Sequence, residues 1–332
     1  MKFLICGLGS IGQRHYQNLR SLGFKNIIVY SPGKGEKEWR FKKRYKVREF
    51  QSLAEALSQK PDVAFITNPT AFHIPSALEA LRANCHLFIE KPISHNLKGV
   101  DYLLKLAKKK NKIVFVGYNF RFHPSLIFIK KVLNQKRIGR PIFARFETGE
   151  YLPDWHPWED YHKGYSARAD LGGGVVVTQS HEIDCAIWFF GQPKSVTAKI
   201  GKFSNLEIDV EDTADIIVEF EKCPQVLIHL DYLQRPPVKA YQIIGSKGKI
   251  FWDYYKGEVQ LVTFSNNKFK IRTFKQPKNF ERNSMYIAEL KHFINCLQGR
   301  ERPINSGEEG KKSLEIALRA KESSSRNKTL YF

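Results

Sequence analysis

Short apolar runs alternate with longer amphipathic segments through the first third of the chain. The runs have the length and composition of buried strands. The segments between them place apolar residues at three- and four-residue spacing, as helices packed on a sheet do. The expected strands cover 2–6, 26–30, 62–66, 87–89 and 113–116, and the expected helices cover 13–22, 52–58, 74–81 and 97–110. This order predicts an open parallel sheet.

The pattern changes in the second half of the chain, where strand-like runs follow one another with only turn residues between them. These runs cover 142–149, 195–201, 213–219, 225–232, 240–244 and 249–252, with an expected hairpin turn at Gly245–Gly248. Two helices, 284–297 and 307–321, close the chain. A chain of 332 residues is long for a single domain, so we expect two, at 1–122 and 123–332.

A glycine-rich turn follows the first expected strand. It reads Gly7-Leu-Gly9-Ser10-Ile11-Gly12 and leads into a helix and then a second strand. In that context the first glycine permits a tight turn, the second lets the backbone approach a pyrophosphate, and the third lets helix and strand pack closely. The amides of the helix N-terminus supply a partial positive charge. A chance glycine turn is the alternative, but the context favours a dinucleotide site.

The choice between NAD and NADP is encoded at the end of the second strand. NAD sites usually place an acidic residue there, which binds the 2′-hydroxyl of the ribose. This chain has Ser31, with Lys34 and Arg40 nearby. The missing carboxylate and the basic neighbours favour NADP, although Ser31 could also bind an unphosphorylated ribose.

Charged residues end the strand at 87–89. Glu90-Lys91-Pro92 follows it directly, and ligands of open parallel sheets bind beyond the carboxyl ends of the strands. Pro92 restricts Lys91 and could follow a cis bond, which would fix the direction of the lysine. An ordinary surface turn is the alternative interpretation of this tripeptide alone.

Two further strand ends carry polar residues. Thr67-Asn68-Pro-Thr-Ala-Phe-His73 forms a polar turn that we expect at the same sheet edge as Lys91. Asn119 and Arg121 follow the strand at 113–116. These two side chains could bind substrate, or could cap and pair locally.

A histidine in the second half is the other candidate for proton transfer. His181 follows Gly172-Gly-Gly174 and begins an expected helix that runs to Phe190. Asp184 lies three residues later on the same helical face, where it could orient the imidazole. A lone histidine is more often structural, but the glycines that precede His181 and its partner carboxylate favour function. Lysine and histidine can both have a pKa near the operating pH, as a general base requires.

Together these stretches resemble the Gfo/Idh/MocA family of NAD(P)-dependent oxidoreductases. The matching segments, in the family's order, are Gly7–Gly12, Thr67–His73, Glu90–Pro92, Gly117–Pro124, His181–Asp184 and Val210–Ile216. The resemblance implies a Rossmann domain followed by a substrate-binding and oligomerisation α/β domain with a large, open, mainly antiparallel sheet. It also implies hydride transfer on sugars, cyclitols or nucleotide-linked sugars, and a homodimer or homotetramer formed through the open sheet.

The resemblance also assigns site residues. It implies that Lys91 and His181 are catalytic. Cofactor contacts are expected from Gly7, Gly9, Ser10, Ile11, Gly12, Ser31, Thr67, Asn68, His73, Glu90 and Lys91, and substrate contacts from Asn119, Arg121, Tyr165 and Asp184. No metal is expected.

One departure from the family concerns the position four residues before His181. Many members have an aspartate there, whereas this chain has Val177. The acid–base relay therefore cannot be copied whole, and another polar group, such as Tyr161 or Tyr165, would have to substitute. A catalytically silent cofactor-binding sensor with the same fold is therefore the alternative function.

The segment 151–162 is dense in aromatic and polar groups. Trp155 and Trp158 could stack on a sugar while Asp154, His156, Glu159 and Asp160 bind hydroxyls. A structural or oligomer-contact loop is nearly as well supported, and metal binding by His156 and His162 has less support because the spacing fits no standard pattern. With the loop 233–237, the segment resembles members linked to surface-polysaccharide sugar synthesis.

Composition limits the remaining possibilities. The net charge of +21 could indicate nucleic acid or an anionic substrate. Eight lysines and arginines between Lys34 and Arg48 are interleaved with glutamates and form no nucleic-acid motif, so we expect a solvated helix and no nucleic-acid partner. The apolar runs fall short of a membrane span. Five scattered cysteines without a C-x-x-C pair suit a reducing compartment, so we expect a cytoplasmic protein.

Overall fold

A six-stranded sheet forms the centre of the first half of the chain. The computed structural model describes residues 1–32, 36–265 and 268–332. The strands lie in the order β3-β2-β1-β4-β5-β6, and all neighbours are parallel. Their bounds are β1 Phe3–Cys6, β2 Ile27–Tyr30, β3 Arg48–Phe50, β4 Val63–Ile66, β5 His86–Ile89 and β6 Val114–Val116. The predicted parallel sheet is confirmed, with β3 as an additional edge strand.

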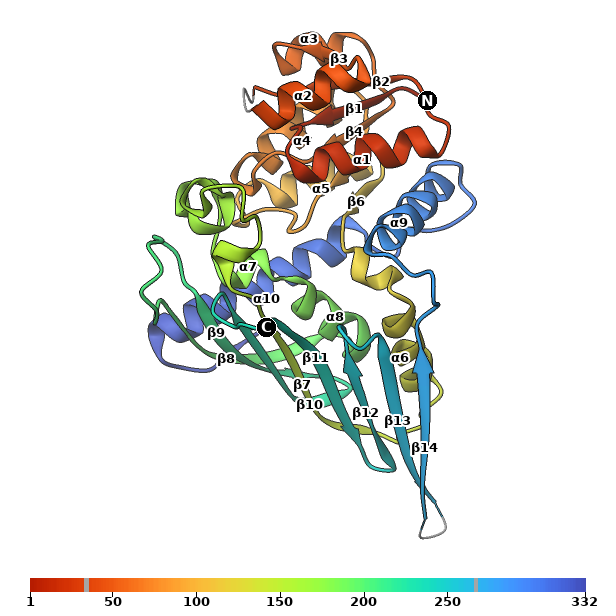
Figure 1. Cartoon of the computed structure of the whole chain (residues 1–332), viewed down its shortest axis with the longest axis vertical. Helices are drawn as coiled ribbons and strands as arrows, with labels where there is room; N and C mark the ends of the chain where they lie inside the picture. The colour runs from red at the N-terminus through yellow and green to blue at the C-terminus, as the bar shows by residue number, and fades with distance from the viewer. Residues whose placement is uncertain (33–35, 266–267) are drawn as a thin grey trace. The chain divides into compact units, whose positions relative to one another are not determined.

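Helices connect these strands, as the amphipathic spacing predicts (Figure 1). They are α1 Ser10–Ser21, α2 Glu36–Tyr45, α3 Leu53–Ser58, α4 His73–Arg82 and α5 Val100–Lys109. Local chemistry fixes some of their ends: the Ser52 side chain caps α3 by accepting a hydrogen bond from the Glu55 amide at 3.2 Å. The basic segment is helix α2, where Lys42 pairs with Glu38 and Glu49.

Three phenylalanines stack across neighbouring strands of this sheet. Phe65, Phe88 and Phe115 are in register on β4, β5 and β6, and their ring centroids lie 4.8 and 5.3 Å apart. Phe293, from helix α9 (Arg282–Leu297), packs against all three. Such aromatic pairs contribute about 0.5–1.5 kcal/mol each beyond the area they bury. They explain why α9 packs with the first half of the chain.

Two compact units result, and they divide the chain differently from the predicted 1–122 and 123–332. The first unit is Met1–Asn119 with Arg282–Lys312, and the second is Phe120–Glu281 with Ser313–Phe332. The predicted change near residue 120 is present, but the chain later returns to the first unit. The aromatic contacts of Phe293 are the physical reason for this return.

The second unit contains a nine-stranded sheet in the order β14-β13-β12-β11-β7-β10-β9-β8-β15. All neighbours are antiparallel except β7 and β10, which are parallel. The bounds are β7 Pro141–Gly149, β8 Pro193–Gly201, β9 Thr213–Phe220, β10 Cys223–Asp231, β11 Val238–Gly245, β12 Gly248–Asp253, β13 Glu258–Ser265, β14 Lys268–Lys275 and β15 Leu330–Tyr331. The mainly antiparallel sheet and the turn at Gly245–Gly248 are confirmed.

One face of this sheet is covered by helices and the other is open. Along β9 buried side chains alternate with more exposed ones, as in a sheet packed on one side only. Helices α7 (Val175–Thr178) and α8 (His181–Phe190) contact its central strands, and α6 (Pro124–Asn134) contacts β13 and β14 (Figure 1). The final helix, α10, runs from Gly307 to Arg326.

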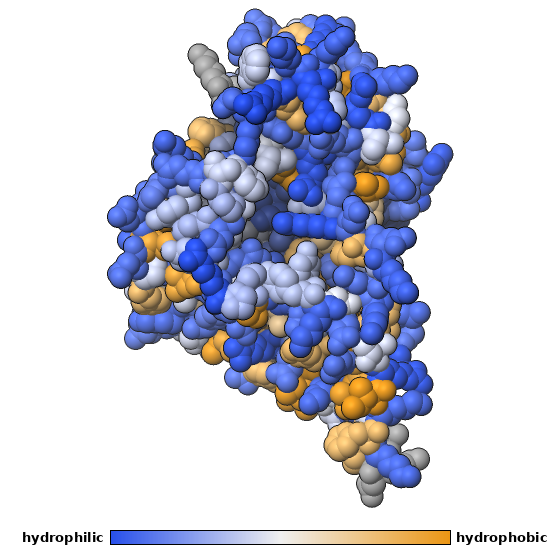
Figure 2. Space-filling model, in the orientation of Figure 1, coloured by the Kyte–Doolittle hydropathy of each residue, from blue (hydrophilic) through white to orange (hydrophobic). Residues whose placement is uncertain are grey.

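The long hairpin of β13 and β14 was not among the predicted strands. The side chains of β14 are mostly exposed, although its charged and apolar residues alternate as in a strand, whereas Val259 and Leu261 of β13 are buried. Figure 2 shows apolar residues gathered toward this hairpin, where Phe264, Phe269 and Ile271 are exposed.

Two global features bear on the compositional expectations. Within the described ranges, no helix combines the length and apolar character needed to cross a bilayer. All five cysteines are free and buried.

An ionic network lies on the open face. His229 on β10 faces Asp215 on β9, with Nδ1 2.8 Å from Asp215, and its Nε2 lies 3.0 Å from Asp231. These carboxylates, Asp231 foremost, raise the pKa of His229 to about 9, against the opposing effect of burial.

We expect His229→Asn to lower the free energy of unfolding by about 1–3 kcal/mol near pH 6. Because the pKa is raised in the folded state, the stabilisation is complete below about pH 6.5 and is lost as the pH rises through about 9. Urea unfolding at pH 6, 8 and 10 measures this, with the exposed His156→Asn as control. A difference independent of pH would contradict it.

Candidate functional site

The glycine turn packs against the neighbouring loop of the same sheet. Gly7 has φ +98°, and a Cβ there would lie 2.7 Å from the Asn68 amide nitrogen. A Cβ on Gly12 would lie 2.1 Å from the Gly7 carbonyl oxygen. Both positions therefore require glycine for reasons internal to the fold, as predicted for the tight turn and for helix packing.

Gly9 differs, because nothing in the described chain requires glycine there. It caps α1 with an extended backbone (φ −65°, ψ −171°), and a Cβ on it would meet no described atom within 4 Å. Glycine has no side chain that could accept a hydrogen bond, so the first amides of α1 have no side-chain cap from this position. Open space beside uncapped amides suits the predicted pyrophosphate.

Ser31 follows β2 at the position that selects the ribose. It is buried, and its Oγ accepts a hydrogen bond from the Leu8 amide at 3.2 Å, which ties it to the glycine turn. Arg40 pairs with Glu36 one turn away on α2. Lys34, the other basic neighbour, lies outside the described residues.

The predicted cofactor residues in the loop after β4 form hydrogen bonds at the same edge of the sheet. Thr67 Oγ1 lies 2.7 Å from the Gly7 carbonyl oxygen and 3.0 Å from that of Cys6. His73 is buried, with Nε2 2.9 Å from the Asn68 carbonyl oxygen and Nδ1 2.9 Å from that of Pro92. Burial lowers the pKa of His73, with the two carbonyl oxygens opposing the shift. The loops after β4 and β5 are thus joined through one imidazole.

Glu90-Lys91-Pro92 lies at the end of β5, where the strand pattern predicts it. The bond between Lys91 and Pro92 is cis. Glu90 is buried, and its Oε1 lies 2.6 Å from Nε2 of His15, a fully buried histidine of α1. Lys91 itself is partly exposed. The structure therefore separates the two charges: Glu90 faces the interior, whereas Lys91 reaches the surface of the unit.

Asn119 stands at the end of the first unit and is buried. Its Oδ1 has no hydrogen-bond partner in the part of the chain that the structure describes. Behind this turn, Asn305 donates to the Tyr118 carbonyl oxygen at 3.0 Å and to Glu289 at 3.2 Å. An open acceptor on a fixed turn suits a hydroxyl ligand, but the predicted substrate contact stays a prediction.

Arg121 and Asp184 form a bidentate ion pair inside the second unit. Arg121 Nε lies 3.0 Å from Oδ2 and Nη2 lies 2.7 Å from Oδ1 of Asp184, and both side chains are buried. The pair joins the turn after Phe120 to helix α8. Arg121 is therefore paired, but with a residue 63 positions away in sequence and not with a local partner. A role for either residue in binding substrate stays a prediction.

His181 is the first residue of α8 and is partly exposed. Its ring stacks on Phe120, with centroids 4.4 Å apart and planes 11° from parallel. The Lys239 ammonium lies 5.0 Å from the centre of the Phe120 ring. The imidazole is therefore held by an aromatic partner that sequence analysis did not identify.

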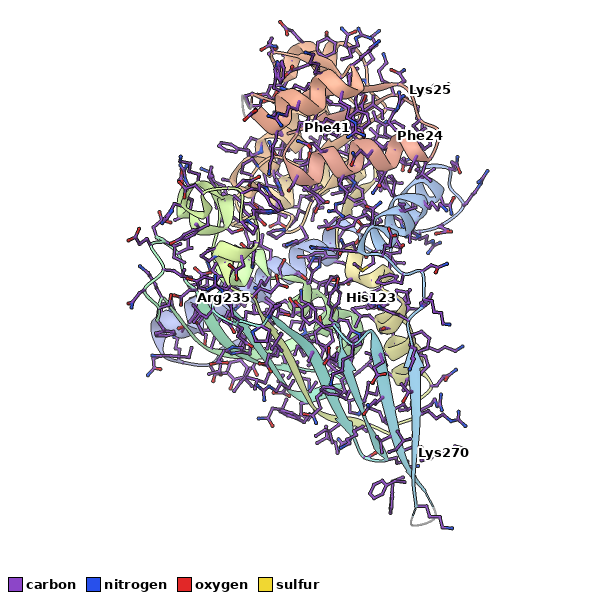
Figure 3. The ribbon with its side chains drawn as sticks, viewed as in Figure 1. Phe24, Lys25, Phe41, His123, Arg235 and Lys270 are labelled. Carbon is purple, nitrogen blue, oxygen red and sulfur yellow. The ribbon has the colours of Figure 1, made fainter. Side chains whose placement is uncertain are left out.

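A second histidine supports the same cluster. His123 is fully buried, and its Nδ1 accepts a hydrogen bond from the Ser125 amide at 3.1 Å, which caps α6 (Figure 3). Burial, with Lys239, lowers the pKa of His123 to about 4. The ring is thus neutral at physiological pH and serves as structural packing.

The glycines before His181 have structural causes. A Cβ on Gly173 would lie 2.2 Å from the Tyr165 carbonyl oxygen, and one on Gly174, at φ +108°, 2.3 Å from the Glu211 carboxylate. They let the segment around Tyr165 pack closely, so they give no independent support for catalysis. Val177 is buried in α7, and Tyr165 is half-buried.

The aromatic segment 151–162 is tied to the loop after β10. Arg235 forms a bidentate pair with Asp154, and its guanidinium lies 3.8 Å from the centre of the Tyr151 ring (Figure 3). This arginine holds the pKa of Asp154 below its usual value. Trp155 packs edge-on against Tyr232, whereas Trp158 is 65% exposed. Asp154 and Trp155 thus have structural partners, and Trp158 donates from Nε1 to Glu159 at 3.1 Å and packs against His156.

Histidine–carboxylate pairing also occurs at His162 of this segment. Its Nδ1 lies 2.6 Å from Asp160 and its Nε2 lies 3.3 Å from Glu207. Among the residues described, no group of three or more histidine, cysteine or acidic side chains is arranged to hold a metal ion.

A parallel nucleotide-binding sheet with a glycine turn, joined to a second α/β unit, defines the class: a dinucleotide-dependent oxidoreductase. Two family models agree. Residues 1–118 match the oxidoreductase family, NAD-binding Rossmann fold, and residues 130–331 match the oxidoreductase family, C-terminal alpha/beta domain. The chain belongs to the Gfo/Idh/MocA family of oxidoreductases.

Individual relatives match over nearly the whole chain. Myo-inositol 2-dehydrogenase of Thermotoga maritima is 27% identical, covering 97% of this chain and 96% of the relative. Levoglucosan dehydrogenase in complex with NADH and levoglucosan superposes with a TM-score of 0.87 at 17% identity, covering 100% and 98%. The WlbA dehydrogenase from Bordetella pertussis, in complex with NADH and UDP-GlcNAcA, gives 0.83 at 21%, with the same coverage. These structures share the fold.

Sequence analysis missed His15 and Phe120. His15 was detectable, because it lies three residues after Gly12 and four before Leu19, on the apolar face of α1. Nothing in the sequence marked Phe120 as part of the site, since a phenylalanine in an aromatic stretch is usually predicted to lie in the hydrophobic core.

We expect Asp184→Asn to lower the free energy of unfolding by about 3–5 kcal/mol, because the buried Arg121 guanidinium loses its counter-charge. Chemical denaturation measures the loss. Asp170→Asn is the matched control, since Asp170 makes the same bidentate contact with Arg168 in solvent and its removal should change little. Equal effects of the two substitutions would contradict the structural importance of the buried pair.

Proposed function

We propose that this oxidoreductase is a dehydrogenase or reductase of a sugar, cyclitol or nucleotide-linked sugar. The observation that carries the proposal is the open, uncapped amide edge at Gly9, with Lys91 projecting from another strand end of the same sheet. The named activities of the inositol and levoglucosan dehydrogenases support a ring carbon that bears a hydroxyl. Sequence identity below 30% leaves the individual sugar open.

The first unit fits the cofactor. Gly7, Gly9, Ser10, Ile11 and Gly12 would hold the pyrophosphate through backbone amides and the positive end of α1. Thr67, Asn68 and His73 form the adjoining wall. Nicotinamide, when bound, supplies the hydride acceptor or donor at the reacting carbon.

Proton transfer is carried out by side chains of this protein. Oxidation of an alcohol releases a hydride from carbon and a proton from the hydroxyl, so a base must take the proton. Lys91 and His181 are our proposed acid–base and hydrogen-bonding groups. The stacking of His181 on Phe120 supports a fixed imidazole plane. The buried, apolar Val177 leaves the family aspartate without a replacement at its own position.

We expect Lys91→Met to lower kcat/KM by about 10²–10⁴-fold while cofactor affinity stays within a few fold, because the ammonium acts on the hydroxyl. The absorbance of reduced nicotinamide measures turnover, and fluorescence titration measures the affinity for the cofactor. The exposed Lys98→Met is the matched control and should retain full activity. Undiminished turnover in Lys91→Met would overturn the role of Lys91.

For the cofactor we propose a preference for NADP. The support is Ser31 in place of an acid at the end of β2. The pairing of Arg40 with Glu36 reduces the support from that arginine.

Replacing Ser31 by Asp tests this preference. The carboxylate would accept a hydrogen bond from a free ribose 2′-hydroxyl and repel a 2′-phosphate, so the ratio of NADPH to NADH dissociation constants should rise at least tenfold. Ser31→Asn introduces a neutral side chain of the same size as aspartate, so it should change this ratio of dissociation constants far less. Tighter NADH than NADPH binding by the unchanged chain would contradict the preference.

The alternative function is a silent cofactor-binding sensor. Val177 favours it, because the relay lacks its aspartate, whereas the retained Lys91 and His181 favour an enzyme. A sensor would bind reduced cofactor without turnover on any member of a panel of sugars, inositols and UDP- or GDP-sugars. Nucleic acid is not a proposed partner.

Oligomerisation and location complete the proposal. We propose a homodimer or homotetramer formed through the open face of the nine-stranded sheet. The support is a sheet face with exposed apolar residues, among them Ile217, Ile244 and Phe251. A cytoplasmic location is supported by five free cysteines.

A further inference from the structure

Helix α1 has a second point of attachment to the sheet edge, besides the glycine turn. Its N-terminus is capped by Gly9, and His15, six residues further along, is fully buried. The Nε2 atom of His15 lies 2.6 Å from Oε1 of Glu90, 75 residues away in sequence. A buried charge–histidine contact of this length is a strong hydrogen bond.

The carboxylate of Glu90 is confined on its other sides as well. Its Oε2 accepts a hydrogen bond from the Lys91 amide at 3.3 Å. A Cβ on Gly117 would lie 3.1–3.2 Å from all three carboxylate atoms, so the glycine leaves just enough room for them. One carboxylate therefore contacts helix α1, the backbone of Lys91 and the strand end after β6.

Aromatic rings hold the imidazole of His15 in place. Its ring lies 4.9 Å from Phe88 and 5.2 Å from Phe65, at the end of the phenylalanine stack, and 6.2 Å from Tyr286 of α9. Its Nδ1 has no hydrogen-bond partner within the described ranges. The single polar contact of this imidazole is thus the one to Glu90, surrounded by aromatic packing.

We propose that His15 and Glu90 are positioning residues, which fix the backbone of Lys91 relative to the glycine turn. The inference rests on the proposed function and adds two residues to it. Because α1 begins at the predicted pyrophosphate cradle, one helix sets both the cofactor seat and, through Glu90, the lysine. A misplacement of about 1 Å at such a site can lower turnover about 100-fold.

A purely structural ion pair is the competing explanation, and the same helix offers a matched control. Asn18, also buried on α1, exchanges two hydrogen bonds with Asn283 of α9, at 2.9 and 3.1 Å. Within the described residues, the side-chain hydrogen bonds of Asn18 are made with Asn283 and not with the turn at Lys91. Asn18→Leu therefore removes buried polar contacts of α1 without touching Glu90.

The experiment compares His15→Leu, His15→Gln and Asn18→Leu. Glutamine places a side-chain amide donor near the position of the histidine Nε2, so it should keep the contact. We expect His15→Leu to lower kcat at least tenfold with less than a twofold change in KM for the cofactor, and His15→Gln to restore most of it. Asn18→Leu should lower the melting temperature and keep kcat. Equal kcat in His15→Leu and Asn18→Leu would overturn the proposal.

Gly117→Ala provides a test that keeps both partners. The added methyl would push the Glu90 carboxylate by a few tenths of an ångström and should lower kcat while the chain stays folded. Unchanged kcat in a folded Gly117→Ala chain would count against positioning.

Amide hydrogen exchange of the segment 88–94 gives a readout independent of turnover. Exchange at Lys91 should be at least tenfold faster in His15→Leu than in the unchanged chain, and unaltered in Asn18→Leu. If the unchanged chain transfers no hydride, the proposed function fails, yet this exchange still decides the positioning role. Equal exchange rates in His15→Leu and Asn18→Leu would overturn that role.

Discussion

A carboxylate buried at the end of a parallel strand is the constraint on which the candidate site depends. A charge out of water is costly unless it is paired and hydrogen-bonded. Glu90 meets this requirement with His15 of α1 and with the Lys91 amide, against the bare backbone of Gly117. Satisfying one buried carboxylate thereby connects the ends of β5 and β6 with the helix that follows the glycine turn. These contacts of Glu90 fix the position of the Lys91 backbone in our proposal.

The second unit solves an equivalent problem with a different pair. The buried Arg121 and Asp184 satisfy each other, which fastens α8 to the turn at Phe120. Phe120 in turn stacks on His181. Each unit therefore presents its proposed proton-transfer residue beside a buried polar pair. We expect the loss of one partner to destabilise either pair, because the other partner is left buried without its contact.

Periodicity and turn chemistry were sufficient to predict most of the fold. The β1–β6 alternation, the glycine turn and the helix at His181 lie where the pattern places them, because local propensity and burial agree there. The hairpin of β13 and β14 was missed although charged and apolar residues alternate along β14, because the prediction relied on buried apolar runs and both faces of this edge strand are mostly exposed. The return of α9 to the first unit was also missed, because Phe293 packs on phenylalanines more than two hundred residues earlier.

The sequence predicted which residues lie at the candidate site, but not which residues they pair with. Sequence spacing identified Glu90, Lys91, Arg121, His181 and Asp184, yet it gave Asp184 to His181, whereas the structure pairs Asp184 with Arg121. It interpreted the glycines before His181 as support for function, whereas Gly173 and Gly174 relieve contacts within the chain. Partners distant in sequence, such as His15 for Glu90, follow from tertiary packing, which spacing within one element does not encode.

Deuterium transfer is the most direct test of the central claim that this oxidoreductase acts on a hydroxyl-bearing ring carbon. Inositols, sugars and nucleotide-linked sugars deuterated at such carbons would be incubated with the full chain and oxidised cofactor, and the nicotinamide analysed by mass spectrometry. The account predicts that one deuteron appears on the reduced nicotinamide with at least one of these substrates. Cofactor binding without deuterium transfer from any of them would contradict it and would favour the silent sensor.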